Sequence, residues 1–380
     1  MDLARTCALL GQVITGSDVL PSSETVDAAL LGRIFRNATA SYKFLFFGAI
    51  LDRVQRDFST PRFVPLRELV IGMVARAFHP AHVFRLSLGA RDQVSNAAQD
   101  VFRRLPTNSS SVSLERTILT AWDDHTEEQV SDLVRYVPFR LLRPWFSAEL
   151  DGKPDSEING AIRVLAETKF LERRPLYRFA DSQSIEIHPD WMTYLRNNLA
   201  VVHGWAAWHW ATYLSARNPN VPNVIQKLDA ERKPFNWQRR YWDGILSKST
   251  FRCPYSGEEL SPDKYALDHF LPWAFVAHDE IWNLCPVAPV VNARKSDRVP
   301  NLARYLREFV EIQYQGLISS REHAGDRLHK RAVEDIAIGL RLTPAQVEMK
   351  SQLASAYQGT IRPLADLAIR MGFGGEWVWQ

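Results

Sequence analysis

The sequence predicts a mainly α-helical protein with one small embedded mixed α/β unit near residues 250–300. Three observations support this fold class. Apolar runs long enough for buried helices occur early in the chain, as in SYKFLFFGAILDRVQRDF. Two short alternating runs, LYRF and IEIH, follow the helical stretch SEINGAIRVLAETKFL and predict a β-hairpin near residues 176–188. After residue 264, a strand-like run ends at Pro272 and a short helix follows.

Local signals mark the ends of several helices. Thr126 and Gln129 form a capping-box pattern at the start of a run with apolar residues at helical spacing. Another helix is predicted to start at Thr343, with Pro344 at its first position. A long helical run ends at Asn218, where the segment NPNVPN begins.

The 380 residues exceed what one hydrophobic core usually serves. The polar segment PTNSSS at residues 106–111 predicts a linker or long loop. We therefore expect a helical N-terminal domain at 1–110, a mostly helical domain with the hairpin at 111–235, the mixed unit at 236–310, and C-terminal helices packed on that unit at 311–380.

Composition excludes several classes of protein. Hydrophobic residues make up 46% and charged residues 23%, which is ordinary for a globular chain. The longest apolar run is far too short to span a bilayer, and the N-terminus does not read as a signal peptide. Three cysteines without close pairing do not form a disulfide framework, so we expect a cytoplasmic protein. The net charge of +3 permits an acidic partner without requiring one.

The segment YALDHFLPWAFVAHDEIWNLCPVAPVVNARKSDRVP carries most of the polar chemistry. Hydrolysis of a phosphodiester needs an activated water and groups that stabilise developing charge. His269 suits the role of base because imidazole ionises near neutral pH. Asp268 and Asn292 offer hard oxygen ligands for Mg²⁺, and Lys295 is suited to hold a phosphate.

The geometry of this segment is plausible, with one difficulty. The run YALDHFLP predicts a strand, and VAPVVNARKSD predicts a short helix in which Asn292 and Lys295 share one face. Adjacent strand residues point to opposite faces. Asp268 and His269 therefore serve one site only if the strand bends or ends there.

These residues resemble the HNH (ββα-metal) endonuclease family. The family pattern is an Asp-His pair, a middle Asn, then a helix with Asn and a following Lys, here Asp268, His269, Asn283, Asn292 and Lys295. The spacing also resembles the HNH domains of CRISPR effector nucleases. The resemblance implies that His269 is the general base, that Asp268 and Asn292 bind Mg²⁺ (or Mn²⁺), and that Asn283 fixes the loop between the strands. The nuclease domain would occupy the 236–310 region.

The sequence departs from the family at a structural zinc site. Many members place Cys-x-x-Cys where this chain has Cys253 and Ser256, and a second pair where it has Ala288 and Val291. Zinc requires about four Cys or His ligands. We therefore expect no structural zinc, with packing against the helical regions in its place.

Other polar and aromatic residues have alternative interpretations. We favour a solvated loop position for His278, a small buried role for Cys285, and core packing for the tryptophans of a helix near residue 208. An Asp-His pair alone is more often an ordinary surface pair, and an inactive HNH fold also remains open.

Basic residues flank the candidate site and predict either a phosphate-binding groove or a solvated face. From Lys227 to Arg252 there are seven basic residues against three acids, and from Asn292 to Arg307 five against one. The candidate nucleic-acid contacts are Arg239, Arg240, Arg294, Lys295 and Arg298. A weaker hypothesis assigns DNA contacts to the basic residues of the 157–188 segment.

The leading hypothesis is a Mg²⁺-dependent HNH endonuclease that nicks or cleaves DNA. A long helical N-terminal region beside an HNH domain resembles bacterial anti-phage defence or restriction nucleases, so other defence proteins are possible partners. One rival is a degenerate HNH fold that only binds nucleic acid or a partner protein. A second rival is a nuclease that acts on RNA.

Overall fold

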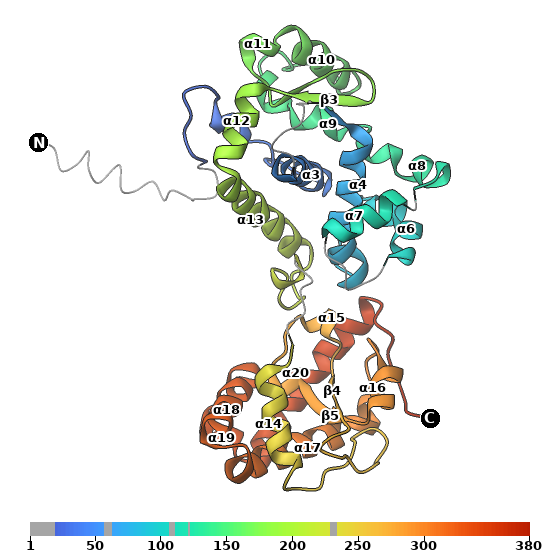
Figure 1. Ribbon diagram of the computed structural model, residues 1–380, viewed down its shortest axis with the longest axis vertical. Helices are drawn as coiled ribbons and strands as arrows, with labels where there is room; N and C mark the ends of the chain where they lie inside the picture. Colours follow the sequence, from blue (N-terminus) through green and yellow to red (C-terminus); the bar gives the residue numbers. More distant parts are fainter. Residues whose placement is uncertain (1–19, 57–62, 106–110, 121, 229–233) are drawn as a thin grey trace, which may run out of the picture. The chain divides into compact units, whose positions relative to one another are not determined.

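The computed structural model describes residues 20–56, 63–105, 111–120, 122–228 and 234–380. The chain forms two compact units, one ending at Asn218 and one beginning at Pro219 (Figure 1). Helices predominate and the strands form two small sheets, so the predicted fold class is confirmed. The finer division into four regions stays a prediction.

The N-terminal unit is built mostly from short helices. Its helical elements are α2 (Ala28–Leu31), α3 (Tyr42–Arg56), α4 (Leu66–Ala77), η1 (Phe78–Val83), α5 (Val94–Ala97), α6 (Gln99–Arg104), α7 (Ser111–Thr120), α8 (Asp124–Ser131), η2 (Asp132–Val134), α9 (Val137–Leu141), η3 (Arg143–Phe146), α10 (Asp155–Thr168), α11 (Phe170–Arg173), α12 (Pro189–Asn197) and α13 (Leu199–Arg217).

The core of this unit surrounds α3, which lies between α4 and α13 in Figure 1. The run from Phe44 to Leu51 is buried throughout, as its continuous apolar sequence predicts. Phe44 stacks on Phe35 and contacts Tyr213 of α13. Close packing of α3 against α4 depends on Gly72, because a Cβ at that position would approach the Ala49 methyl group to 2.8 Å.

A three-stranded antiparallel sheet completes the N-terminal unit. The predicted hairpin is confirmed as β2 (Tyr177–Phe179) and β3 (Ser184–Ile187), with Phe179 opposite Ile185. A third strand, β1 (Phe63–Pro65), pairs with the other edge of β3. Sequence reasoning missed β1 because three residues ending in proline give too short a pattern.

The C-terminal unit combines the mixed segment with longer helices. Its elements are η4 (Gln226–Leu228), α14 (Asn236–Leu246), β4 (Ala266–His269), α15 (Trp273–Val276), η5 (Ile281–Asn283), β5 (Leu284–Val287), α16 (Pro289–Lys295), α17 (Leu302–His323), α18 (Asp326–Leu340), α19 (Pro344–Val347) and α20 (Lys350–Arg370).

The C-terminal helices cover the small sheet of this unit. Gln313 of α17 donates from Nε2 to the Leu284 carbonyl at 2.7 Å, and Phe309 stacks on Phe270 with ring centroids 4.1 Å apart. Tyr357 of α20 donates its hydroxyl to the Trp282 carbonyl at 3.0 Å. These contacts fix the loop between β4 and β5 against α17 and α20.

Helix caps agree with the sequence in one place and differ in another. The helix start predicted at Thr343 with Pro344 at the first position is confirmed as α19, and Thr343 and Gln346 also form a capping box there. The capping box predicted at Thr126 is wrong, because α8 begins three residues earlier than a cap at Thr126 predicts. Its N-cap is Asp123, whose Oδ1 accepts from the Thr126 amide at 2.8 Å. Asp123 is the stronger cap because its carboxylate also interacts with the positive end of the helix.

Two further expectations concern the chain as a whole. Residues 106–110 of the predicted linker lie outside the described residues, and its last residue, Ser111, begins α7. Within the described residues, no helix combines the length and the apolar character needed to cross a bilayer.

Candidate functional site

Asp268 and His269 lie on β4, Asn283 ends the short helix η5, and Asn292 and Lys295 lie on α16. Strand β4 pairs antiparallel with β5, and Asp268 is opposite Cys285. Helix α16 follows β5 and packs on β4. Strand β4 ends at His269, and Pro272 then starts α15. The strand and short helix predicted around Asp268 and Asn292 are therefore both confirmed.

Asp268 points into the protein and is buried. Its Oδ2 accepts from the Tyr255 hydroxyl at 2.9 Å, and its Oδ1 lies 3.1 Å from Nζ of Lys295. Burial, followed by the charge of Asp268, raises the pKa of Tyr255 well above its ordinary value, so this hydroxyl stays a donor. The carboxylate is thus held in one orientation by two donors.

His269 lies on the other side of β4 and its side chain is 10% exposed. Its Nε2 is 2.9 Å from Oδ1 of Asp279 and 3.2 Å from the carbonyl oxygen of His278. Both partners are acceptors, so the neutral ring carries its proton on Nε2. Nδ1 then has the lone pair, and it makes no hydrogen bond to the described residues.

Asp279 is a functional candidate that sequence reasoning missed. It lies in the loop between β4 and β5, where periodicity gives no information on side-chain direction. Its carboxylate accepts from Nε2 of His269 and so fixes the tautomer of the neutral ring. The available signal was an acidic residue within the inter-strand loop, ten positions after His269.

The two asparagines occupy different environments. Asn283 is fully buried, accepts from the Leu271 amide and donates to the Leu271 carbonyl, both at 2.9 Å. These contacts close the loop that joins the strands. Asn292 is partly exposed on α16, and its side chain makes no hydrogen bond to the described residues. Its amide oxygen is free to bind a ligand.

A family comparison agrees with this geometry. Residues 253–301 match the family model described as HNH endonuclease. This segment is an HNH endonuclease domain. HNH nucleases act on nucleic acid and typically use a divalent metal ion. No curated protein and no solved structure matches the chain.

The donor groups of the HNH domain fit a hard divalent cation. Asp268 accepts one hydrogen bond on each carboxylate oxygen, so each oxygen retains a lone pair. Asn292 adds a free amide oxygen. The described residues contain no group of three or more His, Cys, Asp or Glu side chains suited to a metal. Oxygen donors of this kind suit a hard cation that retains water or substrate ligands, as Mg²⁺ does.

The phosphate-binding role expected for Lys295 is wrong. Its side chain is fully buried, although Asn292 three residues earlier is partly exposed. Nζ donates to Asp268 and, at 2.6 Å, to the carbonyl oxygen of His269. Lys295 therefore joins α16 to the end of β4 and holds Asp268, and it does not reach a phosphate at the surface.

The expectation of a solvated His278 is also wrong. Its side chain is 14% exposed and its ring packs against Trp282. Nδ1 accepts from the Glu280 amide at 3.3 Å. Burial, helped by neighbouring His269 and Lys227, lowers the pKa of His278 to about 3. The ring is therefore neutral at physiological pH, and its backbone carbonyl is the group that contacts His269.

Buried thiols and packed aromatic rings lie around Cys253 and Tyr255. Cys253 and Cys285 are buried free thiols, and burial raises the pKa of Cys285 well above its ordinary value. Tyr255 packs edge-on against Tyr305 and Trp377. Cys285 is a small buried residue, as expected.

Four of the five candidate nucleic-acid contacts are exposed: Arg239, Arg240, Arg294 and Arg298. Arg294 lies over Trp379 with its guanidinium carbon 5.1 Å from the ring centroid. A cleft of about 490 Å³ is lined by Arg294, Arg298 and residues 375–380. Lys227, counted among the flanking basic residues, is fully buried and so does not belong to a surface groove.

Basic residues of the 157–188 segment are engaged within the N-terminal unit. Lys169 and Arg173 pair with Glu149, Arg174 with Asp190, and Arg178 with Glu186, while Arg163 stacks on Phe139 and Phe179. These partners compete with a phosphate, and the DNA contact expected for this segment stays a prediction.

Proposed function

We propose that the chain is a Mg²⁺-dependent HNH endonuclease that cleaves DNA with a water activated by His269. The observation that carries this proposal is the His269–Asp279 pair at the end of β4. A histidine with one nitrogen fixed by a carboxylate and the other unpaired is arranged as a general base. Nδ1 takes the proton from the attacking water, and Asp279 stabilises the resulting imidazolium.

Asp268 and Asn292 would hold the divalent ion in this proposal. When bound, such an ion supplies positive charge that stabilises the phosphate and the leaving oxygen. The chain's own residues orient these donors. Lys295 and Tyr255 fix the Asp268 carboxylate, and the first turns of α16 present Asn292.

Nucleic-acid binding is assigned to the exposed arginines near the site. Arg294 lies on α16 and Arg298 lies just after it. Their guanidinium groups lie over the rings of Trp379 and Trp377, respectively. Guanidinium groups bind phosphates, and an aromatic ring next to them offers a stacking surface for a base. Arg239 and Arg240 on α14 are further exposed arginines that could contact phosphate. Lys295 is omitted because it is buried.

A role in bacterial anti-phage defence or restriction is the biological context that we propose. It is supported by the sequence resemblance and by the large helical unit that accompanies one nuclease domain. In such an arrangement the helical unit controls when the nuclease acts, and other defence proteins are candidate partners.

The test is cleavage of supercoiled plasmid and of a structured RNA by the full chain in Mg²⁺, Mn²⁺ or EDTA. We expect conversion of the plasmid to nicked or linear DNA with either metal, intact plasmid in EDTA and intact RNA. Cleavage of RNA alone would favour the RNA nuclease. Plasmid binding without cleavage in either metal would identify a degenerate HNH fold.

A further inference from the structure

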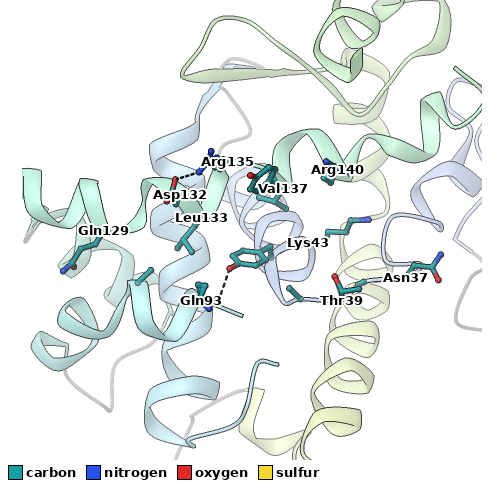
Figure 2. Close-up of a pocket in the computed structure, with 15 residues that line it drawn as sticks. Asn37, Thr39, Lys43, Gln93, Gln129, Asp132, Leu133, Arg135, Val137 and Arg140 are labelled. Carbon is teal, nitrogen blue, oxygen red and sulfur yellow. Dashed lines mark hydrogen bonds and ion pairs between the residues drawn. The ribbon is translucent and has the colours of Figure 1, made fainter. Parts of the chain in front are cut away.

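The N-terminal unit contains a cavity of about 620 Å³ that the nuclease function does not use. It opens where the amino end of α3 meets α5 and the segment from α8 to α9 (Figure 2). Its size falls within the range of about 300–1,000 Å³ typical of small-molecule sites. The cavity therefore has room for a ligand of nucleotide or drug size.

The charge of the cavity is set by Lys43. Its Nζ donates to the Ile34 carbonyl at 2.9 Å, and no described carboxylate lies within ion-pair distance of it. Burial, together with Arg143 and Arg140, lowers the pKa of Lys43 to about 8. A partly buried ammonium without a counter-ion is stabilised by an anion placed beside it.

The other charged groups around the cavity are largely compensated. Arg140 makes a bidentate ion pair with Asp155 and also donates to Asn159. Arg135 lies 3.9 Å from Asp132. These pairs leave Lys43 as the cation in the described lining that lacks a carboxylate partner. The cavity thus favours one negative charge over a strongly charged ligand.

The other residues that line the cavity favour a ligand that contains a ring. Leu133 and Val137 supply apolar surface, and Tyr42 and Tyr136 supply aromatic rings. Tyr136 is 52% exposed, although a large aromatic side chain is usually covered. Amide groups at the edge offer hydrogen bonds to polar atoms of a ligand; they belong to Asn37, Gln93 and Gln129.

We propose that this cavity binds a small organic anion with a planar ring, with Lys43 contacting the anionic group and Tyr136 contacting the ring. The proposal does not depend on the nuclease function. An anion next to Lys43 replaces the missing counter-ion, and the ring of the ligand covers the Tyr136 ring, which is otherwise half-exposed to water.

The test uses two fluorescent probes of nearly the same shape with the full-length protein. One is 1-anilinonaphthalene-8-sulfonate, and the other is N-phenyl-1-naphthylamine, which lacks the sulfonate. We expect the wild type to bind the sulfonate more tightly. Lys43→Met should weaken sulfonate binding by about tenfold to a hundredfold and leave the neutral probe unchanged. Lys153→Met, an exposed lysine of the same unit, should change neither.

Tyr136→Ala provides a second variant that does not threaten the fold, because the ring is half-exposed. It should weaken binding of both probes, and Lys43→Arg should keep the preference for the sulfonate. The proposal is overturned if Lys43→Met binds the sulfonate as tightly as the wild type does. Equal loss of both probes in Lys43→Met, with an unchanged melting temperature, would also overturn it.

Discussion

The position of Lys295 in the motif predicts which helix face it lies on but not how deeply its side chain is buried. Its spacing from Asn292 predicts a shared helix face, but spacing does not show how deeply that face is buried. In the structure Lys295 is fully buried against Asp268, while Asn292 is partly exposed. Desolvating both charges makes the pair sensitive to loss of one partner. Lys295 is therefore a positioning residue for Asp268.

This role predicts the stability of two variants. Lys295→Met should destabilise the chain by about 3–5 kcal/mol, because it leaves Asp268 as a buried charge without its cation. The double variant Lys295→Met with Asp268→Asn should recover most of that loss. Chemical unfolding measures both effects, and Lys248→Met, an exposed lysine of the same unit, is the control. Normal stability of Lys295→Met with weakened DNA binding would instead support a phosphate contact.

Among elements, the ββα arrangement was the most predictable from sequence. The proline after β4 and the apolar run of β5 determine local structure, so the strand and helix around Asp268 and Asn292 were correctly anticipated. The Asp279 contact with His269 was not, because a loop has no periodicity. β1 was missed because it pairs with β3 across more than a hundred residues, and a three-residue strand has no pattern of its own.

Replacing two glycines of the C-terminal helices with alanine should change the stability of the chain in opposite directions, because only one of them packs against the inter-strand loop. A Cβ at Gly339 would overlap the Trp282 indole, whereas a Cβ at Gly359 of α20 meets no atom within 4 Å. Gly339→Ala should therefore destabilise the chain by about 1–3 kcal/mol through overpacking. Gly359→Ala should stabilise it by up to about 1 kcal/mol through helix propensity. Thermal unfolding compares them, and equal shifts would refute the close contact with Trp282.

On the scale of the whole molecule, sequence reasoning identified the helical fold class and the HNH segment, which local patterns determine. It did not find the cavity of the N-terminal unit. That cavity is formed by residues from α3, α5 and the α8–α9 segment, which come together only through packing. It also did not anticipate that Lys227 is buried, because a lysine near other charged residues reads as a surface position.

Lys227 makes the stability of the protein depend on pH. Its Nζ donates to the Pro222 carbonyl, and burial lowers its pKa from 10.5 to about 7. Below pH about 7 the folded state contains a buried ammonium and bears its full cost. Between that pH and about 10.5 the unfolded state binds more protons, so the free energy of unfolding rises with pH.

The matching variant is Lys227→Met, which removes the titrating group. It should be more stable than the wild type at pH 6, by about 2–4 kcal/mol, and this advantage should shrink by pH 9.5. Differences in unfolding free energy between the two proteins cancel the contributions of other groups. An advantage of the same size at both pH values would contradict a neutral, buried Lys227.

A paired measurement of DNA cleavage and DNA binding tests whether His269 is the base of a DNA endonuclease. Cleavage of supercoiled plasmid in Mg²⁺ and binding of the same DNA are compared for the wild type, His269→Ala and His323→Ala. His323 is a partly exposed histidine of the same unit that lies outside the site, so its variant is the control. We predict that His269→Ala cleaves about 10²–10⁴-fold more slowly and binds DNA normally, because the exposed arginines are unchanged. Cleavage by His269→Ala at the wild-type rate would show that His269 is not the base, and loss of DNA binding together with cleavage would show that it supports the fold.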